Sequence, residues 1–179
     1  MERAGCEKMA EEVRKKYNPR DLSPFPYQNV ERLNKDLTIK FFSFNENDLS
    51  RLSGAILFNE KEERYSIFIN SDRPTNRQNF TLAHELGHYF LHKDILKKEG
   101  IIVDDGVFEN NRALFRPDIQ PAHDTRETEA NKFAAALLMP EELLRKAWKD
   151  LGGVEECAEV FNVSVSAMSI RLERLGILK

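Results

Sequence analysis

The strongest restriction on the fold comes from five consecutive residues, His84-Glu85-Leu86-Gly87-His88, in a stretch whose apolar residues recur at helical spacing. Histidines four residues apart lie on one face of a helix, about one turn from each other. Both imidazoles can then bind one metal ion at about 2.0–2.1 Å, the usual Zn–N distance. Glu85 is placed beside such an ion without ligating it, as the general base for an attacking water must be. We therefore predict that His84 and His88 are metal ligands and that Glu85 is catalytic.

A helix that carries two histidines on its surface is the simpler alternative. The neighbours of the motif argue against it, because they are largely apolar; they include Phe80, Leu82, Ala83, Leu86, Phe90 and Leu91. A buried pair of histidines needs polar or metal partners. We expect this helix to begin near Asp72–Pro74, with Asp72 as N-cap and Pro74 in the first turn, and to end near His92.

A catalytic zinc ion takes three protein ligands and keeps one position open, so a third ligand is needed. His92 continues the series of histidines at every fourth residue. At 1.5 Å per residue it lies about 12 Å along the helix from His84, too far to share an ion that His88 also binds. His123, in a predicted loop, is a second candidate, and Glu127 is the candidate that we favour.

A helical wheel of the segment that follows Thr125 separates two glutamates. One arc is apolar and contains Ala130, Phe133, Ala134, Leu137 and Leu138. Glu127 lies at the edge of this arc and faces inward, where a carboxylate is unfavourable unless it is paired or metal-bound. Glu129 is predicted to be a surface charge on the solvated side. The alternative for Glu127 is a charge stabilised by the helix dipole. Asn131, one turn after Glu127, is predicted to hydrogen-bond a ligand histidine.

The rest of the chain reads as a mixture of helices and strands. Helices are predicted over residues 5–17 and 27–33, and three segments rich in β-branched and aromatic residues read as strands: Leu37–Phe44, Ser53–Phe58 and Arg64–Asn70. The polar turn between the last two predicts a hairpin, and the order of the three predicts a small antiparallel sheet. Residues 93–124 contain several glycines and prolines and are predicted to be a surface excursion.

The last thirty residues predict two short helices joined by a turn near Asn162–Ser164, with some helix–turn–helix character. A DNA-reading second helix would use basic side chains, and Arg171 and Arg174 are the ones available. The alternative is a helical pair that packs on the catalytic domain or docks a protein substrate. We expect a metallopeptidase domain over residues 1–150 and a C-terminal helical subdomain over 151–179.

Composition excludes several other classes of protein. The formal net charge is -3 in 179 residues, so we expect neither a nucleic-acid nor a membrane-surface protein. No apolar run approaches the roughly 20 residues that span a bilayer, and the N-terminal segment alternates charges unlike a signal peptide. Cys6 and Cys157 form no CxxC pair, which favours a reducing, cytoplasmic environment.

Two segments together resemble the ImmA/IrrE family of metallopeptidases. They are RQNFTLAHELGHYFLH, residues 77–92, and ETEANKFAAALLMP, residues 127–140; the strand segments SGAILF and IFIN fit as well. The resemblance implies a zincin-like α+β fold with an HExxH helix and a glutamate-bearing helix. It also implies zinc held by His84, His88 and Glu127, with Glu85 catalytic.

The resemblance further implies a substrate class, because several members of the family cleave a helix–turn–helix repressor and so release its genes. Members are encoded in bacteria or on phages and mobile elements. We therefore expect a zinc-dependent, gluzincin-like endopeptidase that acts on such a regulator, with oligomeric state left open. The strand at Arg64–Asn70 is a candidate to pair with an extended substrate. Tyr89, His123 and Arg126 are candidate donors to the oxyanion.

Two further functions stay open from the sequence. One is a regulatory protein with a zincin fold that binds a partner or DNA without catalysis. The other is a toxin–antitoxin component with a helix–turn–helix partner. Manganese or iron could replace zinc as far as the residues alone decide. Gly87, unfavourable in a helix by about 1 kcal/mol relative to alanine, is expected to allow close packing beneath the metal site.

Overall fold

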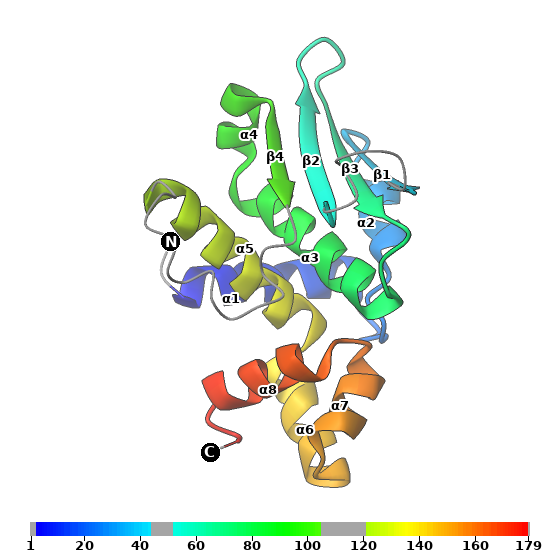
Figure 1. The fold of residues 1–179 in the computed structure, drawn as a ribbon, viewed down its shortest axis with the longest axis vertical. Helices are drawn as coiled ribbons and strands as arrows, with labels where there is room; N and C mark the ends of the chain where they lie inside the picture. The colour runs from blue at the N-terminus through cyan, green and yellow to red at the C-terminus, as the bar shows by residue number, and fades with distance from the viewer. Residues whose placement is uncertain (1–2, 44–51, 105–120, 179) are drawn as a thin grey trace.

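The computed structural model describes residues 3–43, 52–104 and 121–178 (Figure 1). Two helices, α1 (Arg3–Tyr17) and α2 (Tyr27–Leu33), precede the strands β1 (Leu37–Phe42), β2 (Gly54–Asn59) and β3 (Arg64–Asn70). These elements lie where the sequence predicts them. The fold is α+β, as expected.

The sheet is mixed, which corrects the prediction of an antiparallel sheet. β2 and β3 form the predicted antiparallel hairpin, but β1 pairs with β3 in parallel, Leu37 opposite Tyr65. The strand order is β1-β3-β2-β4. Alternating burial, as in β1, decides which side chains face the core but not the direction of the strand. For this reason the sequence pattern could not fix the orientation of β1.

The segment after the motif helix is also more regular than predicted. Instead of a surface excursion, residues 93–104 form a short helix, α4 (Lys93–Glu99), and a fourth strand, β4 (Ile101–Asp104). Gly100 joins them at φ +80°, a conformation that favours glycine and lets the chain turn from helix to strand. β4 pairs antiparallel with β2 and lies at one edge of the sheet.

The two helices that carry the predicted site lie against each other in the middle of the molecule (Figure 1). α3 (Thr75–Leu91) packs on β2 and β3 with one side and on α5 (Pro121–Leu138) with the other, and α5 in turn packs on α1. Gly87 makes the contact between α3 and α5 close, because a Cβ atom there would lie only 3.0 Å from Cα of Ala130. The predicted use of Gly87 in close packing agrees with this contact.

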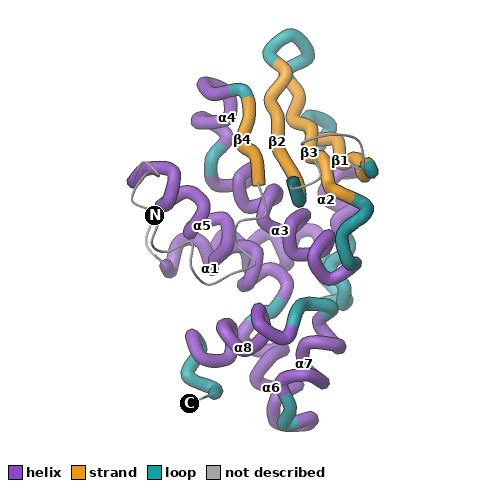
Figure 2. Tube along the Cα trace, viewed as in Figure 1, coloured by secondary structure: helices purple, strands orange, loops and turns teal. Residues whose placement is uncertain are grey.

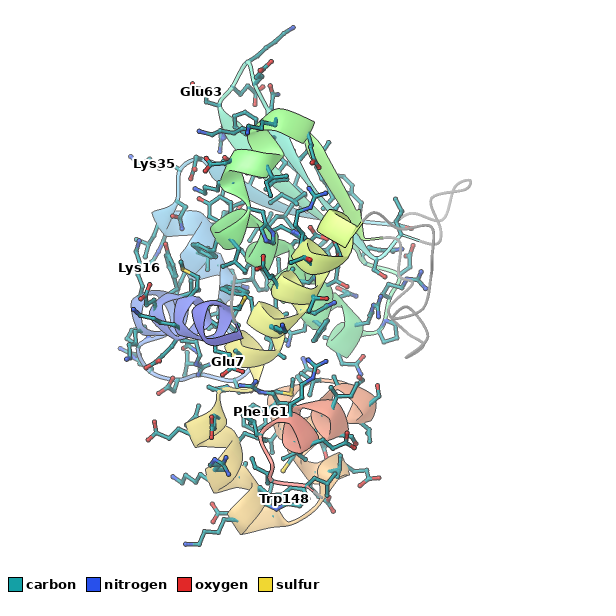
Figure 3. All side chains as sticks on the ribbon, turned by 90° about the vertical axis from the view of Figure 1, so that its left-hand side faces the viewer. Glu7, Lys16, Lys35, Glu63, Trp148 and Phe161 are labelled. Carbon is teal, nitrogen blue, oxygen red and sulfur yellow. The ribbon has the colours of Figure 1, made fainter. Side chains whose placement is uncertain are left out.

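The C-terminal helices α6 (Glu141–Leu151), α7 (Val154–Phe161) and α8 (Val165–Arg174) gather at one end of the molecule (Figure 2). Arg171 of α8 is buried; its Nε donates to the Met139 carbonyl oxygen at 3.1 Å, and its Nη1 to Glu7 Oε1 of α1 at 3.0 Å. Figure 3 labels Glu7 on the side of α1 that faces these helices. The boundary at residue 150 stays a prediction.

Two features bear on the environment of the protein. Within the described ranges, every helix is too short or too polar to cross a bilayer. Cys6 and Cys157 are both free thiols and both buried.

Candidate metal centre

Three side chains of the motif are buried inside the molecule. His84, Glu85 and His88 are between 0 and 2% exposed, because the sheet covers one side of α3 and α5 covers the other. The alternative of two surface histidines is therefore wrong.

The Nε2 atoms of the two motif histidines point at one place. They lie 3.0 Å apart, and Glu127 of α5 completes a triangle with Oε2 at 3.1 Å from His84 Nε2 and Oε1 at 3.3 Å from His88 Nε2. These three residues form the group able to hold a metal ion among the described residues. Ligands about 2.0–2.1 Å from a tetrahedral zinc ion are about 3.3 Å from one another, so the triangle fits the ion.

Burial and pairing give this group the protonation states that a cation requires. Burial, opposed by Glu127, lowers the pKa of His88 from 6.5 to about 4, which keeps the imidazole neutral at pH 7. Burial alone would raise the pKa of Glu127, but the neighbouring imidazoles of His84 and His88 outweigh this and hold it below the ordinary value of 4.5. The neutral imidazole of His88 and the carboxylate of Glu127 leave a buried negative charge, which a metal ion would neutralise.

Asn131 lies beside the first histidine of the motif, where the sequence places it. Its Oδ1 is 3.0 Å from His84 Nδ1. Because an amide oxygen accepts hydrogen bonds, His84 carries its proton on Nδ1 and turns the lone pair of Nε2 toward Glu127. Asn131 and Glu127 thus contact the same imidazole from successive turns of α5.

Glu85 lies on the sheet side of α3, beneath the beginning of β2. A Cβ atom on Gly54 would come within 3.3 Å of Glu85 Oε1 and within 2.5 Å of Thr81 Cγ2, so glycine allows this approach. Gly54 pairs across the sheet with Asp104, the last residue of β4. The end of an edge strand is therefore close to the predicted general base.

The structure does not bring two of the candidate oxyanion donors, Tyr89 and Arg126, to the cluster. The Tyr89 hydroxyl donates to Oδ1 of Asp36, the residue before β1, at 2.7 Å. Burial raises the pKa of Tyr89 far above the ordinary value of 10. Arg126 pairs with Glu99 of α4 at 2.8 Å. Position 123 falls within α5 rather than in a loop, and the side chain of His123 lies outside the described residues.

Glu129 is 7% exposed, so the prediction of a surface charge is wrong. Its Oε2 lies 3.0 Å from His92 Nε2, and His92 Nδ1 lies 2.9 Å from His88 Nδ1. At about 100° per residue, Glu129 lies about 160° from Glu127, but it borders the far end of the apolar arc, about 40° from Phe133. Since α5 packs between α3 and α1, both flanks of this arc are covered.

The chain is similar in sequence and in fold to known proteins. Residues 33–173 match the peptidase M78 family, described as the IrrE N-terminal-like domain. Over 133 residues, 73% of this chain and 69% of the relative, the chain is 29% identical to Metallopeptidase ImmA of Bacillus subtilis (strain 168). The fold is also similar to that of a Mycobacterium tuberculosis transcriptional regulator, with a TM-score of 0.62 and 14% identity.

That last similarity covers 95% of this chain but 46% of the regulator, so this chain spans less than half of that protein, and the likeness concerns the fold alone. The family match extends from α2 into α8 and includes both helices of the His-His-Glu group. The chain therefore belongs to the ImmA/IrrE family of metallopeptidases.

Proposed function

We propose that this metallopeptidase is a zinc-dependent endopeptidase, with His84, His88 and Glu127 as ligands and Glu85 as general base. The observation that carries the proposal is the buried triangle of two Nε2 atoms and one carboxylate, with Glu85 one residue from the first ligand. Two imidazoles and one carboxylate are a common ligand set of catalytic zinc. The same set also binds Fe(II), so the choice of zinc rests on the HExxH motif and the peptidase family.

When bound, zinc would polarise the scissile carbonyl and acidify the attacking water. The protein itself supplies the proton transfers. A carboxylate oxygen of Glu85 takes a proton from the water as it attacks, and later delivers that proton to the leaving amine. Asn131 holds the ring of His84 by its Nδ1, so the lone pair of Nε2 keeps its direction.

The substrate strand needs a free sheet edge, and this corrects the expectation for Arg64–Asn70. That segment is β3, which is paired on both sides, by β1 and by β2. β4 has β2 as its one partner among the described strands, and its end pairs with Gly54, next to Glu85. An extended peptide that adds to β4 would therefore pass the general base.

For the substrate we propose a helix–turn–helix transcriptional repressor, whose cleavage would release the genes that it controls. This rests on the family rather than on a contact in the molecule. The free, buried thiols of Cys6 and Cys157 are compatible with a reducing cytoplasm, which we propose as the location.

The alternative function is a regulator with a zincin fold that binds a partner or DNA without catalysis, alone or in a toxin–antitoxin pair. The hypothesis of DNA binding is less well supported, because Arg171 is buried against Met139 and Glu7. Arg171 is one of the two basic residues that could read bases. Arg174 is the exposed one of the two.

The test is co-expression of the chain with the regulator encoded beside it, comparing wild type with Glu85→Gln. The substitution keeps the volume of the side chain but removes its basic oxygen, so zinc should stay bound while cleavage of the regulator stops. Cleavage is read from an immunoblot of the partner, and zinc from elemental analysis of the purified chain. Normal cleavage by Glu85→Gln would remove Glu85 from the role of general base.

A further inference from the structure

His88 is held on its far side by two residues outside the His84–His88–Glu127 triangle. His92 Nδ1 lies 2.9 Å from His88 Nδ1, and His92 Nε2 lies 3.0 Å from Glu129 Oε2. His88, His92 and Glu129 are all buried. We call this chain of contacts the His88–His92–Glu129 relay.

The order of hydrogen bonds in the relay follows from the chemistry of its ends. A carboxylate only accepts, so the proton of a neutral His92 lies on Nε2, facing Glu129. The lone pair of His92 Nδ1 then accepts from His88 Nδ1, which must carry the proton of His88. The remaining nitrogen, His88 Nε2, is left with its lone pair directed at His84 Nε2 and Glu127.

The relay has a counterpart on the other ligand. Asn131 contacts the far nitrogen of His84 directly, at 3.0 Å. Glu129 reaches the far nitrogen of His88 through His92. Three residues of α5, at positions 127, 129 and 131, thus contribute one carboxylate to the triangle and one outer contact for each imidazole. If the contact between His88 and His92 served only to stabilise the end of α3, there would be no reason for both His84 and His88 to be held with the proton on Nδ1.

We propose that His92 and Glu129 are positioning residues that hold His88 in its Nδ1-protonated tautomer and thereby set the affinity of the metal site. The proposal rests on the proposed metal site. His92 acts through His88, and Glu129 acts through His92. Hydrogen bonds of this kind raise the basicity of the ligand and fix its orientation, and their loss weakens metal binding by about 10- to 100-fold.

The first test measures zinc affinity by competition with a chelator at one fixed pH. His92→Phe keeps the ring volume but removes both nitrogens, so we expect zinc to bind about 10- to 100-fold more weakly. Glu129→Ala should weaken zinc binding in the same direction. Glu129→Gln should recover most of the affinity, because its amide oxygen can accept from His92 as the carboxylate does. Equal loss in the Gln and Ala variants would contradict a positioning role.

Asp36→Asn is the matched control. It makes the same acid-to-amide change at Asp36, whose carboxylate accepts a hydrogen bond from the Tyr89 hydroxyl of α3. It should leave zinc affinity unchanged, although it removes a charge from a part-buried site.

The second test needs no variant and stays valid if His92→Phe does not fold. Nitrogen-15 chemical shifts of the histidines in the zinc-loaded wild type should show His88 protonated on Nδ1 and His92 on Nε2. The opposite tautomers would overturn the relay, as would His92→Phe that is folded and binds zinc within twofold of wild type. A wild type that binds no zinc would instead overturn the metal site itself, so the two failures are distinguishable.

Discussion

At the scale of single residues, the site consists of buried ionisable side chains, and the pKa values of His88 and Glu127 are shifted below their ordinary values. Glu127 is 4% exposed and faces two imidazoles, and a carboxylate is that deeply buried only with partners. The spacing of His84 and His88 was readable from the sequence because it follows from helix geometry alone. Glu127 was reachable from the wheel, whereas Glu129 and His92 required knowing that α5 is covered on two sides.

Glu127→Ala should abolish zinc binding. The substitution removes one of three ligands and leaves two imidazoles that cannot retain the ion through dialysis. Zinc content, measured by elemental analysis, should fall from about one ion per chain to near zero. Glu99→Ala, the same change at the partner of Arg126 on α4, is the control and should keep its zinc. Full zinc content in Glu127→Ala would mean that another residue is the third ligand.

The metal-free protein should lose stability as the pH falls from 7 toward 4. The pKa of His88 is about 4 in the folded state and 6.5 as an ordinary value, so the unfolded chain binds more protons in this range. Glu127, with its lowered pKa, acts in the same direction at lower pH. The contribution of His88 is fully present above pH 6.5 and is on the order of 3 kcal/mol.

Denaturant unfolding of the chelator-treated protein at pH 7, 6 and 5 measures this effect. His88→Gln lacks the titrating ring and should show a shallower decline. Equal slopes for wild type and His88→Gln would show that His88 is not the group responsible.

At the scale of elements, the sequence predicted helices better than strands. Helical periodicity identifies α1, α3 and α5 because it extends over several turns. β4 has four residues, too few for a pattern, and the direction of β1 depends on contacts with β3 that no local signal encodes. The edge that we propose for substrate binding therefore became visible only in the assembled sheet.

The edge of β4 offers a direct test of substrate pairing. Phe58 N donates to the Gly100 carbonyl oxygen at 2.8 Å, and hydrogen-bonded pairs alternate in an antiparallel ladder. By this alternation the N–H of Val103 points away from β2, toward the edge of the described sheet. Val103→Pro removes that donor without removing a bond of the sheet, and proline is tolerated on such edges.

We expect Val103→Pro to bind zinc normally and to cleave its substrate about 5- to 13-fold more slowly at low substrate concentration, since this is the factor that a lost hydrogen bond of about 1–1.5 kcal/mol gives. The measured quantity is kcat/KM for cleavage of the purified regulator, and the zinc content of the variant is measured in parallel. Unchanged cleavage would exclude main-chain pairing at this position of β4.

At the scale of the whole molecule, the question is whether α6, α7 and α8 form a separate DNA-binding subdomain or are part of the peptidase domain. Arg171 favours the second view, because its guanidinium links α8 to the carbonyl of Met139 and to Glu7 of α1. Two further hydrogen bonds also link the C-terminal helices to the rest of the chain: Ser23 donates to the Val160 carbonyl, and Asn79 donates to the Asn162 carbonyl. The composition of the second helix suggested DNA binding as an open alternative, since burial of one arginine cannot be read from the chain.

Arg171→Leu should therefore destabilise the entire protein instead of changing a surface property. The variant fills part of the space but removes the donor to the Met139 carbonyl and the ion pair with Glu7, and an unsatisfied buried carbonyl costs about 1–3 kcal/mol. Unfolding followed by circular dichroism should stay a single transition with a lower midpoint, and zinc affinity below that midpoint should be unchanged. Arg174→Ala, an exposed position on the same helix, should shift stability by about 0.5 kcal/mol or less. If Arg171→Leu instead unfolded in two steps, with α6 to α8 unfolding first, those helices would be an independent folding unit. Arg171 would then be only a contact between two such units.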